Sequence, residues 1–229
     1  FLKYEEEVVE PTYQILKAEL VDKNIFEPIA IYAYYPCISW DNKIYIFDKK
    51  YLFNSLEEAK NVPPLSEAIK VLEFPRQKRK PFRCIADFFA NDRLDVIAFT
   101  LASAGLKISD YERSLYDKGE FTKYYQVHGL GVELAEALAE VLHKQIRLDL
   151  DIVPKEGHTL NDVQMKQYVG CRYSPGYAAC PDLAMNRDIF DLLNPEEFGI
   201  ELSETFQMHP EQTTCAIVVT HKEANYYNI

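Results

Sequence analysis

Ten consecutive residues, 172–181, constrain this chain more than any other stretch. They read Arg-Tyr-Ser-Pro-Gly-Tyr-Ala-Ala-Cys-Pro. Proline removes a backbone donor and fixes φ, and glycine next to proline favours a turn, so the segment is incompatible with a helix. We therefore expect a rigid loop that holds Arg172 and Tyr177 beside exposed backbone.

The residue types in this loop also indicate a kind of ligand. A guanidinium binds carboxylates, a tyrosine ring attracts a cationic centre, and open backbone allows close approach of a flat heterocycle. S-adenosylmethionine (AdoMet) carries all three groups. Taken by itself, the loop is better explained as an irregular connection with an arginine on its surface. The rest of the chain decides between the two.

The composition is that of a globular protein. The chain has 229 residues, of which 48% are apolar and 13% aromatic, enough for one substantial core. No apolar run approaches the ~20 residues that crossing a bilayer requires, and no secretory leader opens the chain. We expect a single domain over residues 1–229 that does not bind membranes.

Charge and cysteine usage exclude further classes. The formal net charge of −11 argues against nucleic acid, because neutralising phosphates requires surplus Lys and Arg. Five scattered cysteines without a Cys-x-x-Cys pair favour a reducing, cytoplasmic location. The cysteines and histidines show no metal-ligand spacing, so no metal site is expected.

One basic segment departs from the acidic average. Arg76, Lys78, Arg79 and Lys80 lie close together, and Arg83 follows. Such a run is most often a solvated loop. The alternative is a docking patch for an acidic protein, because complementary charge speeds encounter.

Apolar spacing predicts two helices. The first covers residues 7–23, and the second and stronger one covers 120–146. The residues expected to form their buried stripes are Val8, Tyr13, Leu16 and Leu20 in the first helix and Leu130, Leu134, Leu138, Val141 and Leu142 in the second.

Runs of β-forming residues predict strands. Segments 29–35 and 43–47 flank a turn at 41–42, which predicts a hairpin. Segments 96–101 and 215–220 are short apolar runs typical of buried strands. Helices combined with hairpin-linked strands indicate an α+β fold.

Five blocks of sequence resemble the activation domain of cobalamin-dependent methionine synthase, and they occur in that family's order. The loop 172–181 is similar to the family's Arg-Pro-Ala-Pro-Gly-Tyr-Pro-Ala-Cys-Pro. The other similar blocks are Cys-Ile-Ala-Asp-Phe at 84–88, Leu-Ala-Glu-Ala-Leu-Ala-Glu-Val-Leu-His at 134–143, Leu-Ser-Glu-Thr-Phe-Gln-Met at 202–208, and Asn-Tyr-Tyr at 225–227. Together they cover about residues 7–229, and the chain is identified as a member of that family.

The resemblance implies both a fold and a role. The fold is a single α+β domain with a curved, mostly antiparallel sheet and flanking helices. The role is to bind AdoMet and present its methyl group for reductive methylation of cob(II)alamin to methylcobalamin. Cobalt is the nucleophile in that reaction, so the domain contributes orientation and needs no catalytic residue of its own. It would be a component of a methyltransferase with no independent turnover.

The resemblance also implies partners. The chain lacks the Asp-x-His-x-x-Gly cobalamin motif. Cobalamin must therefore be held by another domain or by a separate corrinoid protein. The family's reductive step uses flavodoxin, an acidic electron carrier, which would suit the basic segment around Lys78.

Ligand contacts follow from the resemblance residue by residue. Asp87 is expected to accept a hydrogen bond from the ligand's α-ammonium, and Arg172 to bind its α-carboxylate or ribose side. Glu136 is expected to pair with Arg172 and orient it. The remaining expected contacts are the backbone of Ser174 and Gly176 at the adenine edge and the rings of Tyr177, Tyr226 and Tyr227 as walls.

The sequence departs from the family pattern at several positions. Tyr173, Ser174 and Ala178 replace a proline, an alanine and a proline, which predicts a less rigid loop. Lys166 stands where an acidic residue is common, which reverses a charge near the loop.

Two other functions remain open. The first is a stand-alone reactivation or AdoMet-binding protein that serves a different corrinoid methyltransferase, or a fold that has lost its ligand. The second is an ordinary AdoMet methyltransferase, because Gly129-Leu130-Gly131 faintly resembles a glycine-rich cofactor loop. That tripeptide lies in a predicted helix rather than after a strand, which argues against the second reading.

Overall fold

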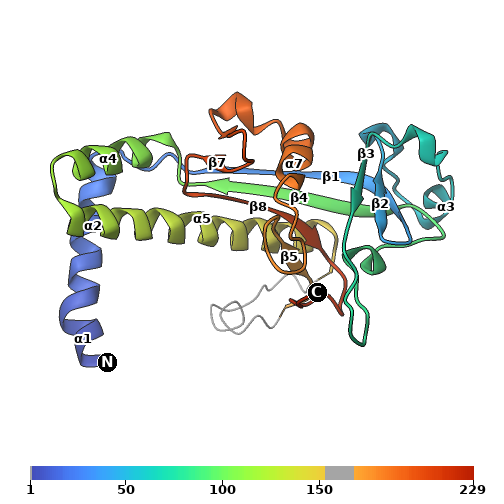
Figure 1. Ribbon diagram of the computed structural model, residues 1–229, viewed down its shortest axis with the longest axis horizontal. Helices are drawn as coiled ribbons and strands as arrows, with labels where there is room; N and C mark the ends of the chain where they lie inside the picture. The colour runs from blue at the N-terminus through green and yellow to red at the C-terminus, as the bar shows by residue number, and fades with distance from the viewer. Residues whose placement is uncertain (1, 153–167) are drawn as a thin grey trace.

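The computed structural model describes residues 2–152 and 168–229, and an antiparallel sheet forms its centre (Figure 1). Six strands pair in the order β3-β2-β1-β4-β8-β5, each antiparallel to its neighbours. These strands are β1 (Ile29–Trp40), β2 (Lys43–Ile46), β3 (Lys70–Glu73), β4 (Asp95–Ser103), β5 (Cys171–Tyr173) and β8 (Thr213–Val219). A small second sheet pairs β6 (Glu201–Leu202) with β7 (Met208–His209).

Helices cover both faces of the sheet. The long helix α5 runs along one face, and α7 packs on the other (Figure 1). The helices are α1 (Leu2–Tyr4), α2 (Glu10–Asp22), α3 (Leu56–Ala59), α4 (Leu106–Asp117), α5 (Phe121–Asp149) and α7 (Met185–Leu193). A π-helical turn, η1 (Glu5–Val9), joins α1 to α2, and short 3-10 turns are η2 (Lys49–Tyr51), η3 (Leu65–Glu67), η4 (Ile85–Phe88) and η5 (Pro195–Phe198). No helix in the described ranges is both long and apolar enough to cross a membrane.

The central strand β4 shows how the two faces differ. Its side chains alternate, so Ile97, Phe99 and Leu101 join the main core under α7. Ala98 and Ala102 point the other way and pack with residues of α5. On β4, the face toward α7 therefore carries bulky residues and the face toward α5 carries small ones.

Small residues on α5 match the small face of the sheet. Gly131, Ala135 and Ala139 recur at four-residue intervals and are buried, which lets the helix lie close to the strands. The prediction that a stripe of leucines and a valine on this helix would be buried was wrong in part. Leu142 is buried, whereas Val141 is 63% exposed and the other three leucines are half-buried.

The remaining predictions of structure had mixed outcomes. The hairpin at 29–47 is confirmed, and its turn places Asp41 at φ 54°. The α+β class with an antiparallel sheet is confirmed. In the first helix, Leu16 and Leu20 are buried as expected, but Val8 and Tyr13 are exposed. Four observed elements were not predicted, namely β3, α4, α7 and the strand at 171–173.

Candidate ligand site

Arg172 is placed by an edge strand. It lies in β5 opposite Val218 of β8, and cross-strand partners point to the same face of a sheet. Val218 packs with Ala98 and Ile146 of α5, so Arg172 also points toward α5. The expected loop at 172–181 is thus corrected at its start, because Cys171–Tyr173 is a strand and the loop follows it.

Gly170 permits the close approach of this strand. Its φ is +96°, which is unfavourable for residues with a side chain. A Cβ at this position would lie 2.6 Å from the carbonyl oxygen of Val219 and 3.2 Å from Nε2 of His143. β5 can therefore begin directly beside β8 and beneath α5.

Two carboxylates from α5 meet the Arg172 guanidinium. Nη1 lies 2.8 Å from Oε1 of Glu140, and Nη2 lies 3.6 Å from Oε2 of Glu136. The Arg172 side chain is 11% exposed, Glu140 25% and Glu136 53%. Burial disfavours the arginine's charge, but attraction to Glu140 outweighs burial and raises its pKa. The expected contact with Glu136 is present, and Glu140 is the nearer partner.

The loop after β5 folds back on itself. The Gly176 N–H donates to the Cys180 carbonyl at 2.8 Å, and the Cys180 N–H donates to the Tyr177 carbonyl at 2.9 Å. Gly176 has φ +88°, where glycine is favoured. This closed turn leaves the Tyr177 side chain 72% exposed beside Arg172.

The C-terminal segment supplies an aromatic wall. The Tyr173 hydroxyl donates to the Asn225 carbonyl at 2.8 Å, and its ring lies 6.2 Å from that of Tyr226 and 6.1 Å from that of Tyr227. Burial, more than any neighbouring charge, raises the pKa of Tyr226 to about 12. The Tyr226 hydroxyl is therefore neutral at physiological pH.

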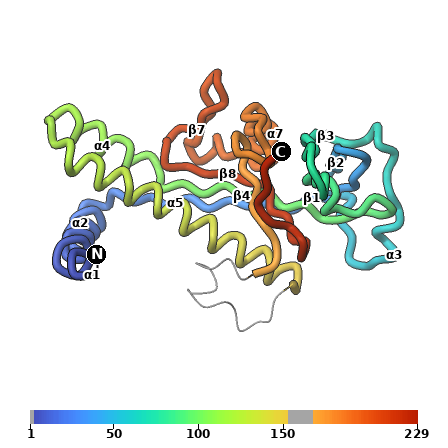
Figure 2. Tube along the Cα trace, turned by 60° about the horizontal axis from the view of Figure 1, so that its bottom comes forward, coloured from blue at the N-terminus to red at the C-terminus, as the bar shows by residue number. Residues whose placement is uncertain are grey.

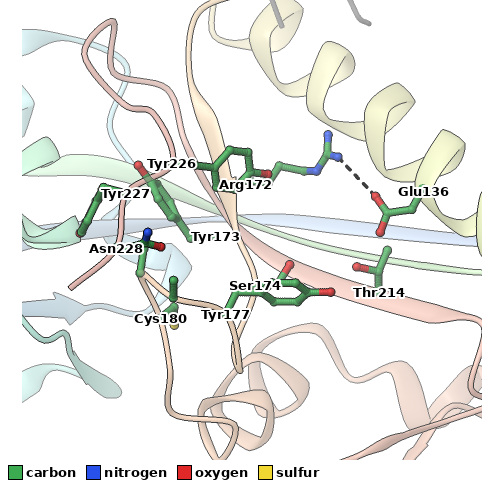
Figure 3. Close-up of a pocket in the computed structure, with 12 residues that line it drawn as sticks. Glu136, Arg172, Tyr173, Ser174, Tyr177, Cys180, Thr214, Tyr226, Tyr227 and Asn228 are labelled. Atoms are coloured by element: carbon green, nitrogen blue, oxygen red, sulfur yellow. Dashed lines mark ion pairs between the residues drawn. The ribbon is translucent and has the colours of Figure 1, made fainter.

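These elements enclose a cavity of about 500 Å³ (Figure 3). Figure 3 shows Arg172 reaching toward Glu136 on one side and the tyrosines on the other. The lining consists of Glu136, Arg172, Tyr173, Ser174, Tyr177, Ala178, Ala179, Cys180, Thr214, Tyr226, Tyr227 and Asn228. Six of the eight residues expected at the ligand site are among them.

A second hollow of about 420 Å³ adjoins the first. Glu136, Ser174, Tyr177 and Thr214 line both, so the two form one cleft on either side of Tyr177. Gly176, the seventh expected residue, lines this second hollow.

Two buried polar groups in the cavity wall lack a matched partner. Nη1 of Arg172 is near Glu140, yet no acceptor among the described residues lies in hydrogen-bonding alignment with it. The hydroxyl of Tyr227 is buried without a partner in the same part of the chain. Both residues line the cavity, but these two atoms are buried, so a ligand would reach them only after the side chains shift.

Asp87 lies elsewhere. Its two oxygens each lie 2.7 Å from a nitrogen of Arg76, and one also accepts from the Cys84 N–H at 2.9 Å. It is not among the residues that line either hollow. A role for Asp87 in binding the ligand's ammonium group therefore stays a prediction, and the structure gives it a pairing role at the start of η4.

Sequence reasoning missed several residues at the site, among them Glu140, Thr214 and Asn228. Helical spacing shows neighbours on the same helix but not across the fold, so it does not reveal the contact of Glu140 with Arg172. Thr214 lies opposite Ala102 and so shares the face beneath α5. Asn228 follows the two tyrosines directly. Lys166 lies outside the described residues.

The comparison with protein families decides the identity. A model of the vitamin B12 dependent methionine synthase activation domain matches residues 3–229. The chain belongs to this family. The resemblance found in the sequence blocks is thereby confirmed.

Relatives agree with the activation-domain assignment. The methionine synthases of Mycobacterium tuberculosis and Mycobacterium leprae are each 37% identical over 212 residues, which cover 87% of this chain. The match covers 17% of each relative's length. The chain thus corresponds to a small part of those proteins.

A solved structure shares the fold. The crystal structure of the MetH reactivation domain bound to AdoHcy superposes with a TM-score of 0.83 at 24% sequence identity. The alignment covers 99% of this chain and 71% of that one. The predicted activation-domain fold, an antiparallel sheet flanked by helices, is confirmed.

Proposed function

We propose that this activation domain, over residues 1–229, binds AdoMet in the cleft beside Arg172 and presents its methyl group to cobalamin. The observation that carries the proposal is one cavity whose lining brings Arg172 together with Tyr177, Tyr226 and Tyr227. A volume of about 500 Å³ lies in the range of small-molecule sites. The relative of shared fold was crystallised with AdoHcy, the demethylated form of this ligand.

Three parts of AdoMet have a matching group in the cleft. The α-carboxylate pairs with the planar fork of Arg172, which orients it more strictly than a lysine would. The sulfonium lies near the rings of Tyr177 or Tyr226, whose faces attract cations. The adenine edge meets backbone at Ser174 and Gly176, where the closed turn exposes the main chain.

The chain's contribution to the reaction is placement. Cobalamin, held by another domain or a corrinoid protein, supplies the nucleophile that accepts the methyl group. Residues of the cleft hold AdoMet so that its methyl points outward, and the rate gain comes from proximity and orientation. In this proposal the chain is a component of a cobalamin-dependent methyltransferase that acts in methionine biosynthesis. Its five cysteines, all buried and free of disulfides, suit a reducing cytoplasm.

Calorimetry tests the binding site. We expect the wild-type chain to bind AdoMet and AdoHcy, and Arg172→Lys to weaken both by about tenfold because the bidentate fork is lost. Arg187→Lys is the matched control, since Arg187 pairs with Glu196 and lines neither hollow. Absence of AdoMet and AdoHcy binding by a folded wild-type chain would overturn the proposal.

A flavodoxin-type protein is the proposed electron donor. Lys78, Arg79 and Lys80 are exposed, whereas Arg76 and Arg83 bind Asp87 and Asn225. Three unengaged cations on one loop suit an acidic partner. Replacing these three with glutamine should flatten the salt dependence of cobalamin reduction by flavodoxin in the full-length protein. An unchanged salt dependence would refute this docking site.

A further inference from the structure

A partly buried tyrosine, Tyr168, contacts the Glu140–Arg172 ion pair. The Tyr168 hydroxyl lies 3.1 and 3.2 Å from the two carboxylate oxygens of Glu140 and donates to them. Glu140 in turn lies 2.8 Å from Arg172, whose guanidinium faces the cavity. Tyr168 itself lines neither hollow of the cleft, so its contact with the site runs through Glu140.

The ring of Tyr168 is fixed by two buried side chains. The guanidinium carbon of Arg147 lies 4.2 Å from the ring centroid, in cation–π geometry. The His143 ring meets it edge-on, with centroids 5.1 Å apart and planes at 87°. Arg147 is 1% exposed and His143 is completely buried. With the ring packed in this way, the hydroxyl points toward Glu140.

The charges of the side chains around Tyr168 explain why the direction of its hydroxyl matters. Among the described residues, Arg147 has no carboxylate within ion-pair distance, and attraction from Glu140 reaches it at longer range. His143 is neutral, because burial and the nearby arginines lower its pKa to about 2. Glu140 thus attracts both buried guanidinium groups, and at 25% exposure it is less exposed than Glu136. The Tyr168 hydroxyl lies almost equally close to both Glu140 oxygens, so it holds the carboxylate as a whole beside Arg172.

We propose that Tyr168 is a positioning residue, which holds Glu140 and through it aims the Arg172 guanidinium at the carboxylate of the bound amino-acid tail. The proposal rests on the proposed function for the identity of the ligand. It assigns Tyr168 no contact with the ligand itself. Its ring stacks on Arg147, and its hydroxyl supplies the orientation.

The test uses two ligands that differ in the tail. AdoHcy carries the α-carboxylate, and 5′-methylthioadenosine carries the same nucleoside and thioether without it. We expect Tyr168→Phe to weaken AdoHcy binding by about tenfold, the effect of one hydrogen bond to a charged group. Binding of 5′-methylthioadenosine should change less than twofold, since it does not use Arg172.

Tyr35→Phe is the matched control. Tyr35 is a buried tyrosine whose hydroxyl donates one hydrogen bond, to the Leu192 carbonyl at 2.6 Å, and it lines neither hollow. Its replacement should leave the ratio of the two affinities unchanged. Equal loss of both ligands in Tyr168→Phe would indicate a merely structural role and overturn the proposal.

A double-mutant cycle tests the route through Glu140. If Tyr168 acts through Glu140, the AdoHcy losses of Tyr168→Phe and Glu140→Gln should be strongly non-additive. Additive losses would contradict that route.

A ligand-free readout separates this inference from the proposed function. Tyr168→Phe should accelerate exchange of the Arg172 side-chain Nε–H in NMR spectra of the free chain, while Tyr35→Phe should not. Unchanged exchange overturns the positioning role even if AdoHcy binds. Faster exchange supports it even if AdoHcy does not bind, and in that case the function proposal fails alone.

Discussion

Two tyrosine hydroxyls in the same wall have opposite surroundings. Tyr173 donates to the Asn225 carbonyl, whereas the Tyr227 hydroxyl is buried without a partner among the described residues. Burial of an unsatisfied hydroxyl costs free energy that a ligand contact would recover. At Tyr227, the stability of the ligand-free chain and the binding of a ligand therefore favour different side chains.

Replacing Tyr227 should separate these two effects. Tyr227→Phe removes the unsatisfied hydroxyl, so the free energy of unfolding should stay equal or rise by up to about 1 kcal/mol. Tyr173→Phe, the matched control, should lower it by about 1 kcal/mol because the Asn225 carbonyl loses its donor. Urea denaturation of the ligand-free variants measures both.

The same variant should bind AdoMet more weakly than wild type. A Tyr227→Phe chain that is clearly destabilised, or that binds AdoMet unchanged, would contradict the view that this hydroxyl is kept for the ligand.

At the scale of elements, the bounds of the long periodic segments could be predicted from the sequence, but which face of the helix is buried could not. Strand β4 and helix α5 were expected close to their observed bounds, because apolar runs and helical spacing extend over many residues. The buried face of α5 was misjudged because Ala135 and Ala139 are buried, whereas of the expected residues Leu142 alone is buried. Small residues carry little hydrophobic signal, although they allow close packing.

Short elements escaped prediction for a different reason. β5 has three residues and is a strand because β8 pairs with it, which no local pattern reveals. The same limit applies to the site. The sequence blocks pointed to Arg172 and Glu136, but Glu140 meets Arg172 of β5, and Tyr168 meets Glu140, through tertiary contacts.

At the scale of the whole molecule, the N-terminal helices lie at one end and α3 at the other (Figures 1 and 2). The carboxylate of Glu19 links α2 to α4 and α5. Glu19 lies 2.5 Å from Lys23 on its own helix and 2.6 Å from Lys123 of α5, and it accepts from the Tyr111 hydroxyl of α4 at 2.8 Å. Hydrogen bonds from Lys123, Lys23 and Tyr111 lower the pKa of Glu19 to about 2.

This junction should make stability depend on pH. A carboxyl whose pKa is lower in the folded than in the unfolded chain stabilises the fold above its unfolded pKa of about 4.3, and the effect is lost as pH falls toward the folded value. Glu19→Gln should therefore lower the free energy of unfolding at pH 7 by about 1 kcal/mol, after allowance for solvent screening of a partly exposed group. Between pH 4.3 and about 2 the difference from wild type should shrink.

Glu57→Gln provides the comparison, since Glu57 forms an exposed pair with Lys60 and no ion pair with any other residue that the structure describes. It should change stability by less than about 0.5 kcal/mol at either pH. Urea unfolding of the three chains at pH 7 and pH 3 measures the contrast. A Glu19→Gln effect that is equally large at both pH values would mean that packing of the side chain, rather than its charge, joins α2 to α4 and α5.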